Sequence, residues 1–314
     1  MHLSDLNNPE IILPKNANKI PIKSITSDSR KLTKDCMFVA IKGYAKDGHD
    51  FIDEAISGGA SNILVDYSYK VSKQLPLSKS KNVRKALALV ASIYFNKQPN
   101  IIAAVTGTNG KTSVCTFLKQ IWDLNNFTSA SLGTLGLNAS REIKHKETQN
   151  ENLTTLDPIE LHECISQIKQ LGVDRLALEA SSHGLEQHRL DGVKVSLACF
   201  TNLSHDHIDF HKSLDNYKKQ KFRLFTEILQ DSGTAVINID DVNSKELLNK
   251  IQSRNINIIT FGKSSNANWK IKKIFETGDH KTFELFVNKK SFIIPTALNS
   301  NFQIYNAIAA ACLA

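Results

Sequence analysis

Several features that would place a chain in a common protein class are absent from this 314-residue sequence. Its five cysteines are odd in number, lie far apart and never form a C-x-x-C pair, which argues against a disulfide framework or a zinc knuckle. No apolar run approaches the roughly 20 residues of a membrane span. The N-terminal stretch MHLSDLNNPE does not read as a secretion signal. We therefore expect a cytoplasmic protein whose cysteines act as small apolar residues.

Aromatic residues are few, at 7% of the sequence, and they are scattered. This distribution excludes the interleaved aromatic and basic residues of a nucleic-acid-binding platform. Lys and Arg outnumber Asp and Glu by 39 to 31, and the formal net charge of +8 suits anionic partners such as nucleotides or sugar phosphates. A generally basic, solvated surface would give the same balance, so charge alone names no partner.

The chain is longer than one compact domain normally is, which predicts two domains. In the first part, apolar runs predict two strands and two helices, over residues 36–43, 62–66, 50–60 and 83–95. The Lys- and Ser-rich stretch 69–82 reads as an exposed connection. Because QPN follows the second helix, we place the boundary near residue 98 and predict a small N-terminal α/β domain over 1–98.

From residue 99 onward, strand and helix patterns alternate, beginning with IIAAVTG and KTSVCTFLKQIW. Strands separated by helices of this length predict parallel β-α-β units in a doubly wound sheet. Beyond residue 267, three consecutive strands follow, with Phe283, Leu285 and Val287 on one face, as in an antiparallel extension. The stretch 301–314 predicts a final apolar helix. The fold class is therefore α/β, with a mostly parallel central domain over 99–314.

The stretch GTNGKT has the composition of a phosphate-binding loop. Gly107 and Gly110 permit a tight turn that aims backbone N–H groups and a helix N-terminus at a polyphosphate. Lys111 would reach the β- and γ-phosphates, and the Thr112 hydroxyl would bind Mg²⁺. Val105 stands where the common pattern has its first glycine, so a plain glycine turn is the alternative. The strand before and the helix after the loop favour the phosphate site.

Five segments together resemble the Mur ligase family over essentially the whole chain. AVTGTNGKTS (104–113) is similar to the family's ATP loop, and residues 26–52 resemble its first domain, which binds the UDP-sugar. The other similar segments are LTTLDPIELH (153–162), EASSHGLEQHRLDG (179–192) and FTNLSHDHIDFH (200–211). The resemblance implies an ATP- and Mg²⁺-dependent ligase that works as a monomer in cytoplasmic peptidoglycan precursor synthesis. It would add a diamino acid, meso-diaminopimelate or lysine, to UDP-N-acetylmuramoyl-L-alanyl-D-glutamate through an acyl phosphate.

The resemblance also implies roles for individual residues. It places the uridine nucleotide on Ser29 and Arg30, and the muramoyl dipeptide on Thr154, Thr155, Ser181, Gln187 and Arg189. It places ATP on Gly107, Thr108, Asn109, Gly110, Lys111, Thr112, Ser113 and Asn306. It places Mg²⁺ on Thr112, Glu179 and His207, with Lys221 as the family's carbamylated lysine. The catalytic set is Lys111, Glu179, His207 and Lys221.

Three of these roles have a clear chemical reason. Glu179 ends the strand RLALE, and open α/β sheets bind ligands beyond the carboxyl ends of their strands. The guanidinium fork of Arg189 matches a carboxylate. Lys221 can react with CO₂ only as a neutral amine, which requires a depressed pKa and therefore partial burial. Taken singly, these residues also fit a surface carboxylate, a surface arginine and a solvated helix face.

A zinc hydrolase is an alternative, because SHDHIDFH places His205, His207, Asp209 and His211 at alternate positions. The pattern of such enzymes has a histidine where this chain has Phe210, and they need no phosphate loop. We therefore expect His205 and His211 to be a loop residue and a helix-start residue rather than ligands.

The family's third domain, which selects the amino acid, has no counterpart in this sequence, and neither does its D-N-P-x segment. We interpret the chain as a piece of a longer product. The alternative is an inactive remnant that binds nucleotide and UDP-sugar without a full ligase cycle. Two residues depart from the family's pattern. Leu156 replaces a frequent Pro at the entry to the helix 158–171, and Gln303 replaces a common Asn near the nucleotide.

Overall fold

The computed structural model describes residues 1–43, 46–70, 76–140, 153–204, 208–277 and 280–314. The chain divides into two compact units. The N-terminal unit comprises Met1–Asn96, Asp157–Ser166 and Gln187–Val193, and the C-terminal unit comprises Lys97–Leu156, Gln167–Glu186 and Lys194–Ala314. The sequence suggests two continuous domains, 1–98 and 99–314. In the structure, the two later segments 157–166 and 187–193 pack with the first unit.

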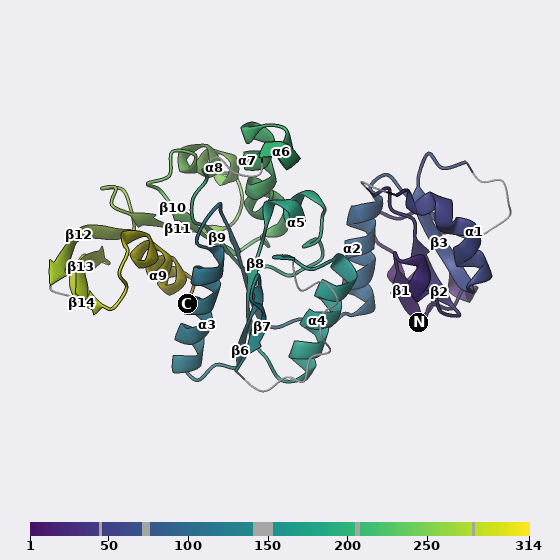
Figure 1. The fold of residues 1–314 in the computed structure, drawn as a ribbon, viewed down its shortest axis with the longest axis horizontal. Helices are drawn as coiled ribbons and strands as arrows, with labels where there is room; N and C mark the ends of the chain where they lie inside the picture. Colours follow the sequence, from purple (N-terminus) through teal and green to yellow (C-terminus); the bar gives the residue numbers. More distant parts are fainter. Residues whose placement is uncertain (44–45, 71–75, 141–152, 205–207, 278–279) are drawn as a thin grey trace. The chain divides into compact units, whose positions relative to one another are not determined.

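The described residues of the N-terminal unit form a parallel four-stranded sheet in the order β1-β2-β3-β4 (Figure 1). Alternate residues of β2 point to opposite faces of this sheet. Met37 and Val39 pack with helix α2, whereas Phe38 packs with helix α1. The elements are β1 (Ser24–Thr26), β2 (Cys36–Val39), β3 (Ala60–Asp66), β4 (Leu77–Ser80), α1 (Ile52–Ser57), α2 (Val83–Tyr94) and the first part of α4 (Pro158–Gln170).

Strand β4 corrects one prediction. The sequence predicts an exposed connection over 69–82, and this is wrong for Leu77–Ser80, which pairs in parallel with β3. Ser78 and Ser80 are buried, and the Ser78 hydroxyl donates a 2.9 Å hydrogen bond to Asn62 Oδ1. The strand has no apolar pattern because its buried positions are small polar residues that find partners inside the unit.

The described residues of the C-terminal unit form a ten-stranded sheet in the order β14-β13-β12-β11-β10-β9-β5-β8-β6-β7. Its centre, from β11 to β6, is parallel, and β7 and the strands β12–β14 add antiparallel pairs at the two edges. This arrangement confirms the predicted fold class. The strands are β5 (Ile101–Thr106), β6 (Ser129–Gly133), β7 (Gly136–Ala139), β8 (Arg175–Glu179), β9 (Leu197–Phe200), β10 (Thr234–Asn238), β11 (Asn257–Gly262), β12 (Trp269–Thr277), β13 (His280–Val287) and β14 (Lys290–Thr296).

Helices cover both faces of this sheet. Cys199 faces the side covered by α3 and α9, and its neighbour Phe200 packs edge-to-face on Phe222 and Phe225 on the other side. The helices are α3 (Lys111–Leu124), the last part of α4, α5 (Ser182–Glu186), α6 (Ile208–His211), α7 (Leu214–Arg223) with the π-helical turn Leu224–Ile228, α8 (Ser244–Ile251) and α9 (Asn301–Leu313). α4 begins at Pro158 despite the departure at Leu156, because the Asp157 carboxylate accepts a hydrogen bond from the Ile159 amide.

Strand β5 lies at the switch point of the sheet. It pairs with β8 on one side and β9 on the other, although both follow it in the chain. The connections that leave β5, β8 and β9 therefore meet at one edge, which is where open α/β sheets bind ligands. The fold thus brings the phosphate loop, Glu179 and the segment after Phe200 to one place.

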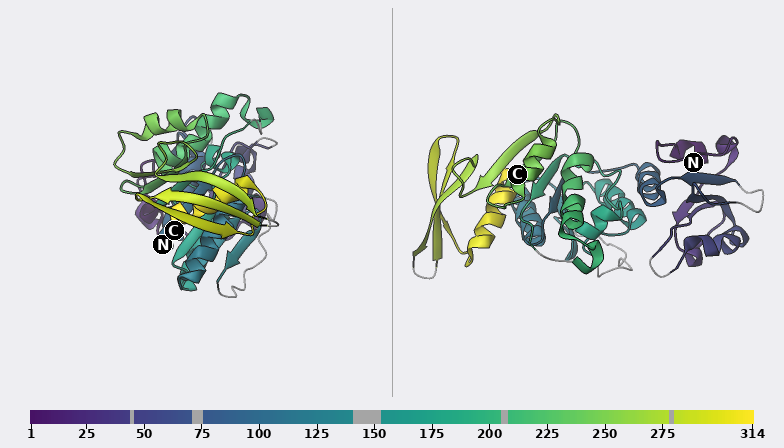
Figure 2. Two further views of the ribbon diagram at one scale, coloured as in Figure 1. Left: turned by 90° about the vertical axis from the view of Figure 1, so that its left-hand side faces the viewer. Right: turned by 90° about the horizontal axis from the view of Figure 1, so that it is seen from above.

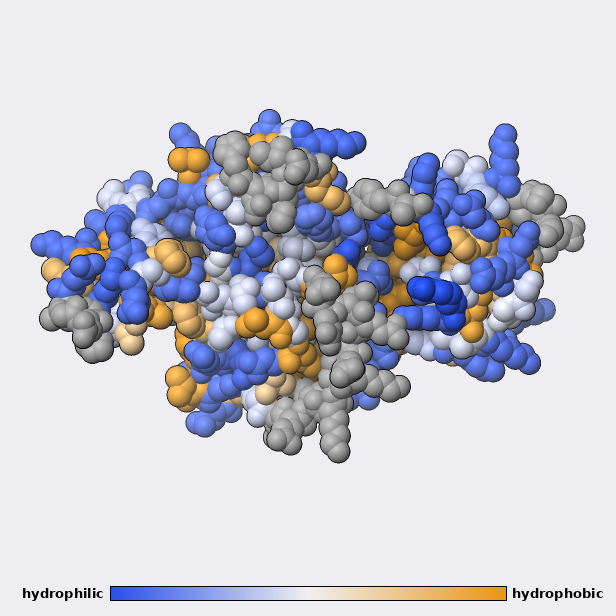
Figure 3. Space-filling model, in the orientation of Figure 1, coloured by the Kyte–Doolittle hydropathy of each residue, from blue (hydrophilic) through white to orange (hydrophobic). Residues whose placement is uncertain are grey.

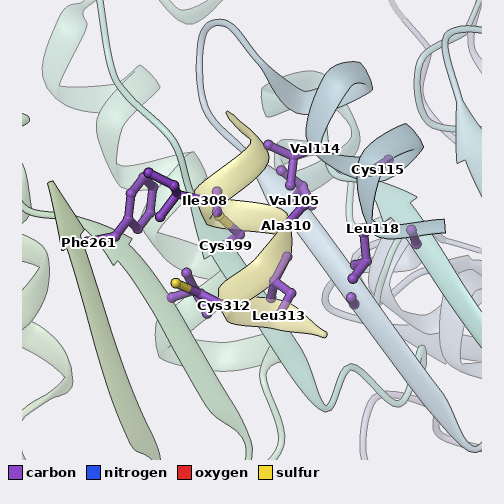
Figure 4. Close-up of a cluster of buried hydrophobic side chains, with 14 of the residues drawn as sticks. Val105, Val114, Cys115, Leu118, Cys199, Phe261, Ile308, Ala310, Cys312 and Leu313 are labelled. Carbon is purple, nitrogen blue, oxygen red and sulfur yellow. The ribbon is translucent and has the colours of Figure 1, made fainter. Parts of the chain in front are cut away.

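One buried cluster of the C-terminal unit joins α3 and α9 to the sheet (Figure 4). Ile308, Cys312 and Leu313 of α9 belong to this cluster together with Val105 and other strand residues, and all are buried. The cysteines confirm the prediction that they are small apolar residues, because all five are free and buried. Burial raises the pKa of the Cys164 thiol to about 12.

Replacing Ile308 by alanine should destabilise this unit by about 2–5 kcal/mol, because a fully packed branched side chain leaves a cavity. Both tryptophans, Trp122 and Trp269, belong to the C-terminal unit, so a urea titration followed by tryptophan fluorescence measures its free energy of unfolding. Phe302→Ala on the same helix is the matched control. Phe302 is 68% exposed, and its loss should cost about 0.5 kcal/mol or less. Equal losses in the two variants would contradict this packing.

Strands β12, β13 and β14 form a twisted antiparallel extension beside α9 (Figure 2). Phe283 and Leu285 are buried in the same cluster as α3 and α9, as the alternation predicts. Hydrophilic residues predominate on the visible face of this extension (Figure 3).

Among the helices of the described residues, none combines the length and the apolar character that a membrane-spanning segment needs.

Candidate functional site

The loop between β5 and α3 can be made only with glycine at two positions. Gly107 has φ 152° and Gly110 has φ 90°, which L-residues with side chains rarely adopt. A Cβ atom on Gly107 would lie 1.9 Å from Thr201 Oγ1, and one on Gly110 would lie 2.4 Å from Asn306 Oδ1. Val105, at the position where the common pattern has glycine, is instead a fully buried residue of β5. The turn therefore begins after the strand, not within it.

Lys111 reaches back across the loop from the first turn of α3. Its Nζ donates hydrogen bonds to the carbonyl oxygens of Gly107 (3.0 Å) and Thr108 (2.9 Å). The first amides of a helix have no partner within the helix, and the helix dipole places partial positive charge there. The ammonium group and the start of α3 together concentrate positive charge beside the loop, which suits an anion such as a polyphosphate.

The segment that follows β9 braces the other side of the loop. The amides of Thr108 and Asn109 donate to the main-chain and side-chain oxygens of Asn202, at 2.9 and 3.0 Å. Thr201 Oγ1 donates to the Asn109 carbonyl at 2.6 Å. Because these two amides already have partners, the amides at the start of α3 are the ones an anion can reach. These hydrogen bonds fix the conformation of the loop.

Helix α9 contacts the first turn of α3 through side chains. Gln303 Nε2 donates to Ser113 Oγ at 3.3 Å, and Asn306 Nδ2 donates to Gln303 Oε1 at 3.1 Å. Asn306 is also the side chain that lies against Gly110. The departure from the family's pattern at Gln303 therefore lies in a chain of hydrogen bonds that ends at the loop. Thr112, which is half-buried, lies in the same first turn of α3.

Lys221 is a buried amine that points at the loop. It is 1% exposed, and its Nζ donates a 2.7 Å hydrogen bond to the Gly107 carbonyl. The same Nζ lies 4.4 Å from the ring centroid of Tyr217, whose hydroxyl is 3.1 Å from Thr108 Oγ1. By contrast, Lys218 pairs with Asp215 and Glu246 on the surface. The description of a solvated helix face therefore does not apply to Lys221.

Glu179 is a buried carboxylate at the carboxyl end of β8, with 2% exposure. Its Oε1 accepts a hydrogen bond from the Thr134 amide (3.0 Å), and its Oε2 accepts one from the Thr134 hydroxyl (3.1 Å). These donors are neutral, and among the described residues no cationic side chain forms an ion pair with this carboxylate. A buried carboxylate is costly without a positive partner, so the position fits a metal ion.

Thr134 was not a candidate in the sequence, because strands β6 and β7 were not predicted. Gly133, the residue before it, gives the only available signal. A Cβ atom there would lie 2.2 Å from Glu179 Oε1, so the close approach of the carboxylate requires glycine. Thr134 Oγ1 also lies 3.1 Å from Thr154 Oγ1. Because the single Thr134 hydroxyl proton goes to Glu179, the Thr154 hydroxyl is the donor in this second contact, which links one of the predicted substrate residues to the Glu179 site.

Thr155 and Ser181 lie together at the start of α5. Their hydroxyl oxygens are 3.0 Å apart, and the Ser181 amide donates to Thr155 Oγ1 at 3.1 Å. Ser181 Oγ in turn accepts a hydrogen bond from the Gly184 amide at 3.0 Å. Thr155 is 1% exposed. Through these contacts, both hydroxyls stabilise the connection between β8 and α5.

The predicted UDP-sugar residues of the N-terminal unit lie in two places. Gln187 and Arg189 line a shallow pocket, and Gln187 Oε1 accepts hydrogen bonds from Arg189 Nε and Nη2 at 3.3 and 2.8 Å. Ser29 and Arg30 do not line this pocket. The Arg30 fork binds Asp28 with two hydrogen bonds of 2.9 and 2.8 Å and lowers the pKa of that carboxyl to about 2.

Two histidines of the SHDHIDFH stretch, His205 and His207, lie outside the described residues, so the structure gives no position for the predicted metal ligand His207. Within the described ranges, no group of three or more His, Cys, Asp or Glu side chains is arranged to hold a metal ion.

The prediction that His211 starts a helix is wrong. His211 ends α6, because Lys212 adopts φ 63° and Ser213 caps α7. It is fully buried, with Nδ1 2.8 Å from Glu186 Oε2.

Comparison with known families identifies the family of this chain. Residues 105–314 match the Mur ligase middle domain. The chain belongs to the Mur ligase family. A second match, over residues 21–113, is to the Mur ligase family, catalytic domain. The two matches overlap over residues 105–113, so both include the whole GTNGKT loop.

Individual relatives agree with this assignment. The UDP-N-acetylmuramoyl-L-alanyl-D-glutamate--2,6-diaminopimelate ligase of Bradyrhizobium diazoefficiens is 39% identical over 317 residues, which cover 100% of this chain and 64% of the relative. The protein of the same name from Caulobacter vibrioides is 42% identical over 220 residues, 70% of this chain and 45% of its own length. A solved structure of a ligase with that name superimposes with a TM-score of 0.85 at 27% identity, covering 99% of this chain and 63% of the other.

A more distant structure shows the same fold. The MurF ligase of Thermotoga maritima, solved in complex with ADP, has a TM-score of 0.58 and 18% identity, and the alignment covers 92% of this chain and 62% of that one. The chain thus spans about 64% of the length of the curated relatives that it matches along its whole length.

Proposed function

We propose that this chain binds ATP and UDP-N-acetylmuramoyl-L-alanyl-D-glutamate as part of a cytoplasmic ligase. That ligase would join the glutamyl carboxylate to meso-diaminopimelate, and it would act as a monomer. The relatives' names support the choice of substrates. The observation that carries the proposal is the phosphate loop itself, in which the Lys111 ammonium donates to the Gly107 and Thr108 carbonyls beside the start of α3. Such a concentration of positive charge around one turn suits a transferring phosphoryl group.

Residues of the C-terminal unit can bind the phosphates and the Mg²⁺ that this reaction needs. A carboxylate is a poor electrophile, and ATP would supply the phosphoryl group that activates it as an acyl phosphate. The amides at the start of α3 and the Lys111 ammonium would hold the β- and γ-phosphates. Glu179 and the Thr112 hydroxyl would hold Mg²⁺, which neutralises phosphate charge, and His207 is the third proposed ligand. Gly107 to Gly110, Ser113 and Asn306 would shape the ATP site.

Lys221 is proposed to carry a carbamate. The reaction with CO₂ requires a neutral amine, and burial to 1% exposure disfavours the charged form. A carbamate changes the side chain from a cation to an anion, so Lys221 would then support Mg²⁺ rather than donate to the Gly107 carbonyl.

In the N-terminal unit, Gln187 and Arg189 are proposed to bind the muramoyl dipeptide, and Ser29 and Arg30 are proposed to bind the uridine nucleotide. In the C-terminal unit, Thr154, Thr155 and Ser181 are proposed to contact the same substrate.

Isothermal titration calorimetry of the 314-residue chain tests this function. With magnesium present, a non-hydrolysable ATP analogue and UDP-N-acetylmuramoyl-L-alanyl-D-glutamate should each bind at one site per chain. Each should bind whether or not the other is present. UTP serves as a control for the nucleotide site, and UDP-glucose serves as a control for the sugar site. A folded chain that gives no heat with either proposed ligand would contradict the function.

A further inference from the structure

The pocket in the N-terminal unit contains two charged residues to which no binding role has been given above, Arg84 and Asp157. Arg84 lies in the first turn of α2, and Asp157 immediately precedes α4. They share this pocket with Gln187 and Arg189. Three stretches of chain that are far apart in sequence therefore bring two guanidinium groups, an amide and a carboxylate to one hollow.

Arg84 and Asp157 both line this pocket, and their hydrogen bonds are to main-chain groups. Arg84 Nη2 donates to the Lys42 carbonyl at 3.2 Å, and Asp157 Oδ1 accepts a hydrogen bond from the Ile159 amide at 3.2 Å. Among the described residues, no ion pair joins these two side chains to each other. The remaining guanidinium donors of Arg84 and the remaining carboxylate acceptor sites of Asp157 are thus available to a ligand.

The surroundings of Arg84 and Asp157 favour strong hydrogen bonds to a ligand. Apolar side chains from Ile41, Leu87 and Pro158 line the same pocket. Burial raises the pKa of the Asp157 carboxyl, and the positive charges of Arg189 and Arg84 oppose that shift. Hydrogen bonds to charged groups in partly apolar surroundings are stronger than those in water. A ligand with an anionic oxygen beside a hydroxyl or N–H would satisfy the arginines and the carboxylate at once.

We propose that Arg84 and Asp157 are further substrate-binding residues, with Arg84 and Arg189 sharing an anionic group of the substrate and Asp157 accepting a hydrogen bond from a neighbouring hydroxyl or amide. This inference rests on the proposed function. UDP-N-acetylmuramoyl-L-alanyl-D-glutamate offers two anionic groups of this kind. Its diphosphate is next to sugar hydroxyls, and its carboxylates are next to peptide amides.

Calorimetry with Arg84→Gln tests the proposal. Loss of a charge-assisted hydrogen bond should raise the Kd for UDP-N-acetylmuramoyl-L-alanyl-D-glutamate about tenfold or more. Lys85→Gln is the matched control, since it removes the same charge from the next residue of α2. The Lys85 side chain pairs with Glu10 at 2.7 Å and does not line the pocket, so its Kd should stay within about twofold of the unchanged chain. Asp157→Asn keeps an acceptor for the Ile159 amide and should raise the Kd about fivefold.

A second ligand identifies the anionic group. UDP-N-acetylglucosamine has the diphosphate and the sugar hydroxyls but no carboxylate. If Arg84 binds the diphosphate, Arg84→Gln should weaken both ligands by the same factor. If Arg84 binds a carboxylate, only the affinity for the dipeptide substrate should fall. Both results support a direct role, and they tell the two groups apart.

An Arg84→Gln chain that binds the dipeptide substrate within twofold of the unchanged chain would overturn this inference alone. An unchanged chain that does not bind that substrate would overturn the proposed function together with the inference. Binding of the ATP analogue and the thermal unfolding midpoint show that each variant is folded. If Arg84→Gln does not fold, Arg84→Lys replaces it. This variant keeps the charge but loses the planar fork, and it should weaken binding about threefold to tenfold.

Discussion

Lys111→Ala should weaken the binding of a magnesium–ATP analogue by about 100-fold, while the affinity for UDP-N-acetylmuramoyl-L-alanyl-D-glutamate stays unchanged. The Lys111 ammonium lies across the loop, within 3.0 Å of the Gly107 and Thr108 carbonyls, and a bound phosphate would take their place. A hydrogen bond between charged groups contributes about 1.5–3 kcal/mol, and about 1.4 kcal/mol corresponds to a tenfold change in Kd. Calorimetry with each ligand in turn measures both affinities.

Lys245→Ala is the control for this result. Lys245 is an exposed residue of α8 in the same unit, so its loss changes the net charge equally but leaves the loop intact. Its effect on the ATP analogue should be no more than about twofold. If Lys111→Ala weakened both ligands to the same extent, the two binding sites would not be separate, and the assignment of Lys111 to phosphate alone would be wrong.

The phosphate loop could be predicted because its signal is local. A buried strand, a turn that needs glycine at 107 and 110, and a helix that starts at Lys111 all lie within a short stretch. The parallel core was predicted for the same reason, since each strand and its following helix have their own periodic patterns. Lys221 shows the limit of this reasoning. Only the fold separates it from Lys218, because burial depends on which face of α7 packs against the loop.

The features that were missed depend on distant contacts. Strand β4 has polar residues at its buried positions, which are satisfied by partners such as Asn62. Strands β6 and β7 are short and rich in small residues, so neither has a period-2 apolar pattern. Missing β6 also hid Thr134, whose amide and hydroxyl hold the Glu179 carboxylate. Likewise, Arg84 and Asp157 are ordinary helix-start residues in the sequence, and only the packing of 157–166 with the N-terminal unit brings them together.

Glu179→Gln should remove most of the effect of magnesium on nucleotide binding. The substitution keeps the size of the side chain. The amide can also keep both contacts to Thr134, because its oxygen accepts from the Thr134 N–H and its NH₂ group can donate to the hydroxyl. What is lost is the anionic oxygen that a hard divalent cation requires. Since even residues that only orient metal ligands contribute about 10–100-fold to affinity, we expect the Kd of the magnesium–ATP analogue to rise about 100-fold.

The measurement that isolates this effect is the ratio of nucleotide affinities with magnesium and with EDTA. In the unchanged chain the ratio should be large, and in Glu179→Gln it should approach one, because the phosphate contacts of Lys111 and the α3 amides do not involve the metal. Glu276→Gln is the control, since this carboxylate is 78% exposed in strand β12 and pairs only with Lys281 at 3.2 Å among the described residues. A Glu179→Gln chain that keeps the full magnesium effect would show that the buried carboxylate holds Thr134 in place and does not bind the metal.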